Sequence, residues 1–163
     1  MTSVEELDAM PPSEAAEIFM SCCGATRWVN DMVAMRPFGS TERVHAAADE
    51  AWGRTSKADW LEAFAHHPRI GERKVEGWAR GEQAGVSSAS ASTHEELADI
   101  NRAYEEKFGH IYIVCATGKS AEEMLDIARR RMSNDADSEL HAAAEEQRKI
   151  MQLRLRKLLG ENQ

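Results

Sequence analysis

The chain has 163 residues and a mass of 18.2 kDa, which fits one domain with a substantial apolar core. Its 20 Lys and Arg residues against 28 Asp and Glu residues give a net charge of -8, which disfavours nucleic acid and anionic membranes as partners. Because the sequence shows no membrane-length apolar run and no signal-peptide pattern, we expect a cytoplasmic protein. Cys22, Cys23 and Cys115 fit neither a disulfide framework nor a zinc pattern, so we expect reduced thiols.

Helix-breaking residues and capping signals divide the chain into short helical segments. Pro12 near the start and Gly24 just past the end predict a first helix at residues 12–23. We expect Thr26 to cap a second helix, which must stop before Pro37.

Two further helices are predicted before the glycine-rich part of the chain. Ser40 or Thr41 can cap the first, whose apolar residues recur at helical spacing: Val44, Ala47, Ala48, Ala51 and Trp52. Ser56 opens the next, and Pro68 must end it because proline disfavours helical conformation in the preceding residue. The longest irregular stretch is then expected around four glycines, and functional residues often lie in such loops: Gly71, Gly77, Gly81 and Gly85.

The second half of the chain also contains mainly helical patterns. Thr93 and Glu96 form a capping-box pattern for a helix that ends at Phe108. Residues 111–116 have high β-propensity, but a single strand has no partner, so we expect a buried extended segment or a helix turn. With helices at residues 120–132 and 137–159, the sequence predicts an all-α, single-domain bundle over residues 1–163. It would have about seven or eight short helices and a glycine-rich active-site loop.

Residues 116–120 resemble a phosphate-binding loop, because Gly118-Lys119-Ser120 follows an apolar run and precedes a helix. The motif also requires a glycine at position 113, where this chain has Ile113. We therefore interpret these residues as a turn with Ser120 as a helix N-cap.

The last predicted helix carries one arginine on its apolar face. Steps of about 100° per residue place Arg154 in the same arc as Leu140, Ala143, Ala144, Gln147, Ile150, Met151, Leu155 and Leu158. A buried guanidinium needs a carboxylate, carbonyl groups or an anionic ligand. Arg154 is therefore either a structural cation, in an ion pair or snorkelling, or a fixed cation that binds a carboxylate or ureide oxygen.

Three other polar residues have both a structural and a functional interpretation. His67 can cap the helix that it ends or face a cavity, and His66 would serve equally well for capping. Glu82, flanked by small residues, is either a solvated loop carboxylate or a ligand-binding group, and Asn101 fits a satisfied buried amide better than a ligand. The remaining histidines show no metal-binding spacing: His45, His94, His110 and His141.

Several segments match one family in order and at compatible spacing over nearly the whole chain. They are residues 67–71 (HPRIG), 81–85 (GEQAG), Asn101 with Tyr104, residues 107–109 (KFG), 113–116 (IVCA), 146–150 (EQRKI) and 153–155 (LRL). Together they resemble the 2-oxo-4-hydroxy-4-carboxy-5-ureidoimidazoline (OHCU) decarboxylases of urate breakdown. The resemblance implies an all-helical, homodimeric enzyme without cofactor or metal that forms (S)-allantoin and carbon dioxide.

The resemblance also implies roles for individual residues. His67 matches the general acid/base, and Glu82 matches the glutamate that acts beside it. The matching substrate-binding positions are Pro68, Ala79, Glu82, Gln83, Tyr112, Ile113, Val114, Cys115, Ala116 and Arg154. Ala79 stands where the family often has serine, so a hydroxyl contact is missing or replaced by water, which affects affinity rather than chemistry.

A second function class is a non-catalytic helical binding or adaptor domain of the same fold, since fold alone does not fix function. An enzyme requires that His67, Glu82 and Arg154 converge on one small buried site. An adaptor would instead expose a broad apolar patch.

Overall fold

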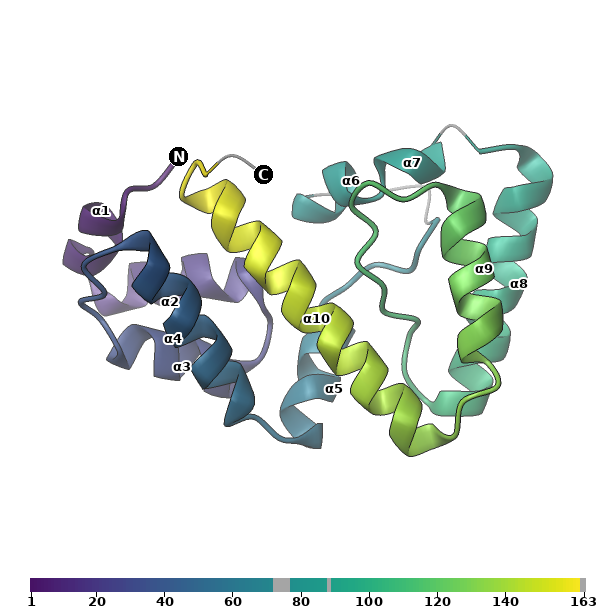
Figure 1. The fold of residues 1–163 in the computed structure, drawn as a ribbon, viewed down its shortest axis with the longest axis horizontal. Helices are drawn as coiled ribbons and strands as arrows, with labels where there is room; N and C mark the ends of the chain where they lie inside the picture. Colours follow the sequence, from purple (N-terminus) through teal and green to yellow (C-terminus); the bar gives the residue numbers. More distant parts are fainter. Residues whose placement is uncertain (72–76, 88, 162–163) are drawn as a thin grey trace. The chain divides into compact units, whose positions relative to one another are not determined.

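A computed structural model describes residues 1–71, 77–87 and 89–161, and within these ranges the chain forms ten helices and no strand (Figure 1). The helices are α1 (Val4–Ala9), α2 (Pro12–Cys22), α3 (Thr26–Ala34), α4 (Thr41–Gly53), α5 (Lys57–Ala65), α6 (Trp78–Glu82), α7 (Ala84–Ser87), α8 (Ala91–Phe108), α9 (Ala121–Arg131) and α10 (Ala136–Leu158). The predicted all-α class is confirmed.

The first of two compact units comprises residues 1–63 and 147–163. Helix α3 packs against both α2 and α4 here. Phe19 and Trp28 meet edge to face with ring centroids 5.9 Å apart, and Trp28 Nε1 donates to the Ala48 carbonyl at 3.0 Å. These contacts bury the apolar faces of the three short helices, which is where most of their stability arises.

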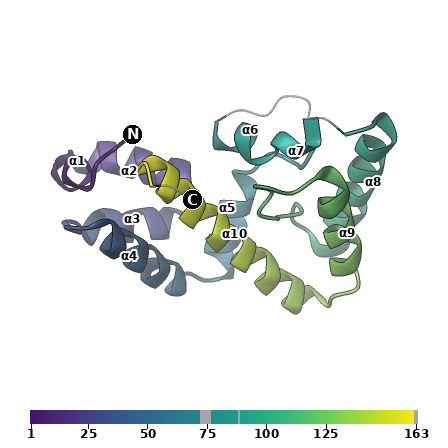
Figure 2. The same cartoon turned by 45° about the horizontal axis from the view of Figure 1, so that its top comes forward.

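The second unit comprises residues 64–146, and α8 and α9 run side by side in it (Figures 1 and 2). Its core gathers apolar residues from these helices and from the segment between them: Leu97, Tyr104, Tyr112, Val114, Ala116, Ala121, Met124, Leu125 and Ala128, with Ile70 and Val86. Residues 111–116 are neither helical nor in a strand. Of the two expectations, a buried extended segment or a helix turn, the helix turn is therefore wrong. Helix α10 contributes residues to both units, with Glu146 the last in the second unit.

Several helix boundaries differ from the predictions. Helix α1 was not expected, and α6 and α7 occupy part of the stretch predicted to be irregular; residues 72–76 of that stretch lie outside the described residues. Ser90 rather than Thr93 caps α8, since the Ser90 side chain accepts the Thr93 N–H.

Thr26 is the first residue of α3 rather than its N-cap. Its backbone N–H and hydroxyl donate to the Glu62 carboxylate at 2.8 and 2.6 Å. This carboxylate satisfies a donor at the start of the helix, which a capping side chain would otherwise do.

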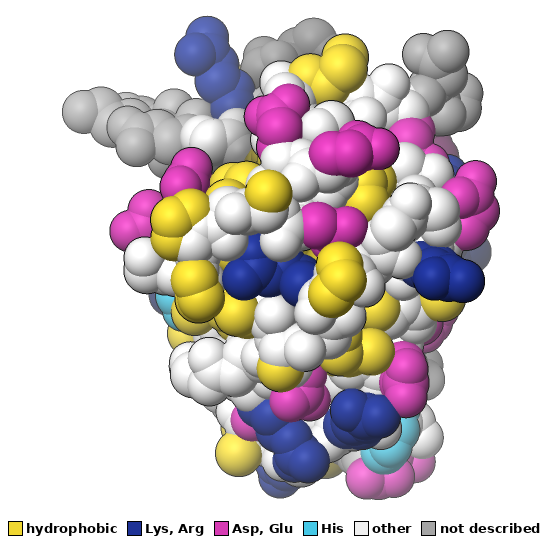
Figure 3. Space-filling model, turned by 90° about the vertical axis from the view of Figure 1, so that its left-hand side faces the viewer, with side chains coloured by type: hydrophobic (Ala, Val, Ile, Leu, Met, Phe, Trp, Pro, Cys, Tyr) yellow, Lys and Arg dark blue, Asp and Glu magenta, His cyan; other side chains and the backbone are white. Residues whose placement is uncertain are grey.

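Ser120 caps α9 in a capping box with Glu123, which confirms the N-cap interpretation. No helix in the described ranges has both the length and the apolar character that crossing a membrane requires. One face of the molecule carries acidic and basic side chains interspersed with apolar ones (Figure 3).

Candidate functional site

The segment that begins with His67 leaves the end of α5 in a turn. The His67 N–H donates to the Phe64 carbonyl at 3.1 Å, and Pro68 follows. His67 and Pro68 are half-buried, whereas His66 is exposed. The difference in burial favours His67 over His66 as the histidine of an enclosed site.

Two side-chain amides attach the end of this segment to the rest of the second unit. Gln83 Oε1 accepts the Gly71 N–H at 3.0 Å. Asn101 Nδ2 donates to the Ile70 carbonyl at 2.9 Å, so the expected buried, satisfied amide is confirmed. The segment is thereby bound to both α8 and the end of α6.

Helix α6 presents buried polar groups. Glu82 is only 7% exposed and Gln83 8%, and Ala79, one turn earlier, is also buried. The interpretation of Glu82 as a carboxylate in water is therefore wrong. A buried carboxylate needs specific partners.

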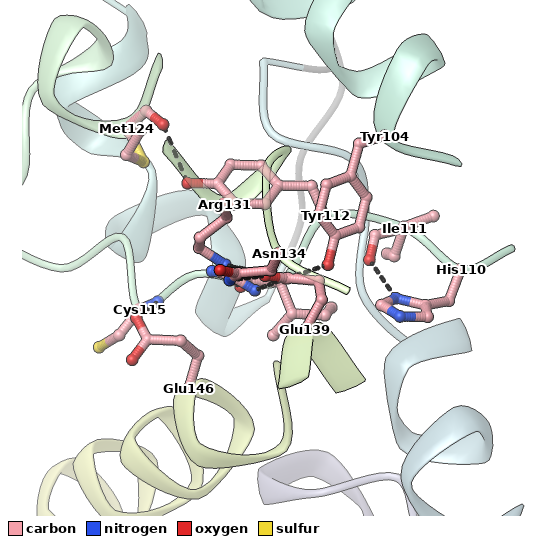
Figure 4. A network of polar contacts seen from close by, with 11 residues as sticks. Tyr104, His110, Ile111, Tyr112, Cys115, Met124, Arg131, Asn134, Glu139 and Glu146 are labelled. Atoms are coloured by element: carbon pink, nitrogen blue, oxygen red, sulfur yellow. Dashed lines mark hydrogen bonds and ion pairs between the residues drawn. The ribbon is translucent and has the colours of Figure 1, made fainter. Parts of the chain in front are cut away.

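Residues 112–116 are buried, and charged side chains bind their main chain (Figure 4). Arg131 Nη1 donates to the Ile113 carbonyl at 2.7 Å. The Cys115 N–H donates to Glu146 Oε1 at 3.1 Å, and its carbonyl accepts from Lys119 Nζ at 2.7 Å. These side chains satisfy backbone groups that a neighbouring strand would satisfy in a sheet.

The turn that follows this segment lies against α7. A Cβ placed on Gly85 would be 2.2 Å from the Lys119 carbonyl oxygen, so the two backbones are in direct contact. Burial raises the pKa of the Cys115 thiol, the Lys119 charge opposes this, and the charges of Glu146 and Glu82 add to it. The second unit therefore brings together the segment from His67, the α6–α7 region and residues 112–116.

A buried ion pair beside this segment was not predicted from the sequence. Glu139 is completely buried, and its Oε2 lies 2.5 Å from Arg131 Nη2. The Tyr104 hydroxyl donates a hydrogen bond to the same carboxylate (Figure 4). Burial and the bond to Glu139 raise the pKa of Tyr104. Burial lowers the pKa of Arg131, but Glu139, Tyr104 and Tyr112 together raise it above its usual value, so the guanidinium stays charged.

A sequence signal for this pair exists on α9. Arg131 lies three residues after Ala128 and seven after Met124, which places all three on one face of the helix. Both of the other residues are buried, so the arginine extends a buried face.

Arg154 belongs to the first unit and is 8% exposed, which confirms that it faces inward. Its Nη1 donates to the carbonyls of Ser21 and Cys22, both at 3.4 Å, at the C-terminal end of α2. Carbonyl contacts of this kind were one of the expected environments for a buried guanidinium. The convergence of Arg154 with His67 and Glu82 stays a prediction.

All three cysteines are buried and none forms a disulfide. Burial raises the pKa of Cys23 to about 12; the neighbouring Cys22 adds to this shift, whereas a backbone hydrogen bond from Ala25 and the Arg154 charge oppose it. Within the described residues, no group of three or more His, Cys, Asp and Glu side chains is arranged to hold a metal ion.

Comparisons with known proteins agree on one family. Residues 8–156 match the OHCU decarboxylase family. The chain is similar to the uric acid degradation bifunctional protein TTL of Arabidopsis thaliana, with 38% identity over an alignment of 148 residues; the match covers 86% of this chain and 46% of the plant protein. It is also similar to the 2-oxo-4-hydroxy-4-carboxy-5-ureidoimidazoline decarboxylase of Amia calva, with 30% identity. That match covers 76% of this chain and 75% of the Amia protein.

A solved structure is similar as well. A crystal structure of OHCU decarboxylase in the presence of (S)-allantoin has a TM-score of 0.81 and 35% identity, and the match covers 90% of this chain and 99% of that one. The chain spans only 46% of the length of the Arabidopsis protein and 33% of a Bacillus bifunctional protein that is 25% identical to it.

Proposed function

Because this chain belongs to the OHCU decarboxylase family, we propose that it converts 2-oxo-4-hydroxy-4-carboxy-5-ureidoimidazoline to (S)-allantoin and carbon dioxide in urate degradation. One observation supports the proposal most strongly. In the second unit, the charge of buried Glu82 acts on the thiol of Cys115 in the segment 112–116, and its neighbour Gln83 binds the segment that follows His67.

The reaction requires a proton donor more than an electron sink. When the bond between the ring carbon and the carboxylate breaks, its electron pair moves into the conjugated C=N of the substrate, so the substrate itself accepts the electrons. The ring carbon that bears the ureido group must then receive a proton on one face. The half-buried His67 is the proposed donor, because an imidazole holds and delivers protons near neutral pH.

Glu82 and Arg154 have complementary proposed roles. The Glu82 carboxylate accepts the ring hydroxyl or a ring N–H and orients the substrate toward His67. Arg154 binds the part of the substrate that remains after decarboxylation, since a strong hold on the departing carboxylate would stabilise the ground state. The other proposed contacts are Pro68, Ala79, Gln83 and the main chain of residues 112–116.

We also propose that residues 1–163 form one OHCU decarboxylase-like domain that works as a cytoplasmic homodimer without a cofactor. The match to the family over residues 8–156 supports the single domain. Sedimentation equilibrium tests the dimer.

The decisive experiment supplies freshly generated substrate and follows circular dichroism and ultraviolet absorbance with and without the protein. Spontaneous decarboxylation protonates either face and gives no optical activity, whereas the enzyme is expected to give one enantiomer rapidly. His67→Asn is the matched variant, because it keeps the size of the side chain but removes its titrating proton. Absence of any acceleration or optical activity with the wild-type protein would refute the proposal and favour the adaptor alternative.

A further inference from the structure

The buried ion pair of Arg131 and Glu139 has no part in the chemistry described above, yet Arg131 contacts the main chain that is proposed to bind the substrate. We infer that Arg131 is a positioning residue for the decarboxylation. It holds the Ile113 carbonyl and thereby fixes residues 112–116 in their binding conformation. This inference rests on the proposed function, because it assigns a role within the same site.

Arg131 is bound on several of its nitrogen atoms, which fixes the orientation of the guanidinium. Its Nε lies 3.0 and 2.9 Å from the two carboxylate oxygens of Glu139, and its Nη2 lies 2.5 Å from one of them. The third nitrogen, Nη1, donates to the Ile113 carbonyl at 2.7 Å. A planar guanidinium held this way delivers its remaining donor in one direction.

The carboxylate that orients Arg131 is itself fixed. Glu139 is completely buried, accepts the Tyr104 hydroxyl, and accepts from Asn134 Nδ2 at 3.1 Å. The guanidinium carbon also lies 5.1 Å from the ring centroid of Tyr112, the residue before Ile113. Arg131 therefore holds the segment through both a backbone carbonyl and an adjacent ring.

Charge compensation of Glu139 alone would not require the contact with Ile113. Charge compensation of Glu139 uses Nε and Nη2, and the Tyr104 hydroxyl contributes a further bond. The bond from Nη1 acts instead on residues 111–116, which are neither helical nor in a strand, so its loss removes a side-chain partner of their main chain. Misplacement of a binding segment by about 1 Å can reduce the rate about 100-fold.

The test must separate positioning from folding, because removal of Arg131 alone strands a buried carboxylate. The double variant Arg131→Met/Glu139→Gln removes both charges, and the new amide oxygen can still accept the Tyr104 hydroxyl. Arg131→Lys is the second variant, since an ammonium balances Glu139 but lacks the planar set of donors that also reaches Ile113. Arg129→Met is the matched control, because Arg129 is an exposed arginine of the same helix.

Melting temperature, kcat and KM per folded molecule, and backbone hydrogen exchange are measured for all four proteins. We expect both Arg131 variants to stay folded and to lose about ten- to a hundred-fold in kcat/KM. We also expect faster exchange in residues 112–116 of the double variant, with unchanged exchange in α8. Arg129→Met should match the wild type.

Wild-type kcat/KM in folded Arg131 variants, or unchanged exchange in residues 112–116, would overturn the inference and leave the proposed function intact. A wild-type protein without turnover would instead overturn the proposed function, and the positioning role with it.

Discussion

Gly85 offers a sharp test of how closely the α6–α7 region must approach the segment that precedes α9. An ideal Cβ at Gly85 would lie 2.2 Å from the Lys119 carbonyl oxygen and 3.2 Å from its carbonyl carbon. Both are backbone atoms, so no flexible side chain can move aside. The Gly85→Ala variant can therefore form only if the two backbones separate by about 1 Å.

The size of the effect follows from this displacement. Overpacking of a well-packed contact costs about 1–3 kcal/mol, which corresponds to a fall in Tm of about 2–12 °C for a chain of this length. Because α7 follows Glu82 and Gln83 directly, a shift of about 1 Å in these groups is expected to reduce kcat/KM about 100-fold.

Gly81→Ala is the control, because nothing lies within 4 Å of a Cβ at that position and Gly81 is helical. Alanine in place of glycine in a helix is expected to stabilise by about 0.5–1 kcal/mol. Melting curves and steady-state kinetics of the two variants give the comparison. Equal Tm and equal kcat/KM for Gly85→Ala and Gly81→Ala would refute the argument from close backbone contact.

Three further predictions concern single side chains. His67→Asn is expected to reduce the formation of optically active allantoin by about 10² to 10⁴ without loss of folding; if exposed His66→Asn has that effect instead, the other histidine is the acid/base. Arg154→Met should weaken binding of allantoin by about one to two decades in a calorimetric titration, since a charge-assisted hydrogen bond is lost, whereas Arg156→Met at an exposed position should not. A large fall in Tm with unchanged affinity would show that Arg154 is only structural. Cys23 has a pKa raised from 9.0 to about 12, so the unfolded thiol ionises first and stability must fall as pH rises from about 9 to 12. Denaturant titrations over that range give the free energy of unfolding as a function of pH. Cys23→Ala should make its fall with pH less steep by up to about 1.4 kcal/mol per pH unit, and an unchanged steepness would contradict the raised pKa of Cys23.

The longer helices could be predicted because their signals are local. Apolar residues at helical spacing in residues 44–52 are the buried residues of α4, and Ser40 caps that helix. The arc on α10 was also predicted correctly, including the inward position of Arg154, although Leu158 is only half-buried. Periodicity and caps act within a few residues, so one sequence is sufficient to recognise them.

The shorter helices could not be predicted, because packing rather than propensity stabilises them. Helix α1 has six residues, and α6 and α7 have five and four residues with glycines among them. Glycine in such a stretch favours a loop on sequence grounds. Burial of Ala79, Glu82 and Val86 against the rest of the second unit reverses that preference.

The site was predictable only in part for a similar reason. Their flanking residues and the resemblance to the family identify His67 and Glu82 as candidates, but burial of Glu82 is a tertiary property. Arg131 was missed because an arginine run at a helix C-terminus already fits the helix dipole, so composition gives no reason to bury one of its members. Its partner Glu139 lies on a different helix and becomes its neighbour only in the folded chain.

The way in which residues 113 and 115 are bound has a consequence for protein engineering. A strand finds its backbone partners in another main chain, which is the same whatever its sequence. Here the partners are the side chains of Arg131, Glu146 and Lys119, which lie 18, 31 and 4 residues away along the chain. The segment is therefore not a portable motif: grafting it onto another helical scaffold requires all three charged positions to be transferred with it. Relatives can be sorted by whether they retain these positions.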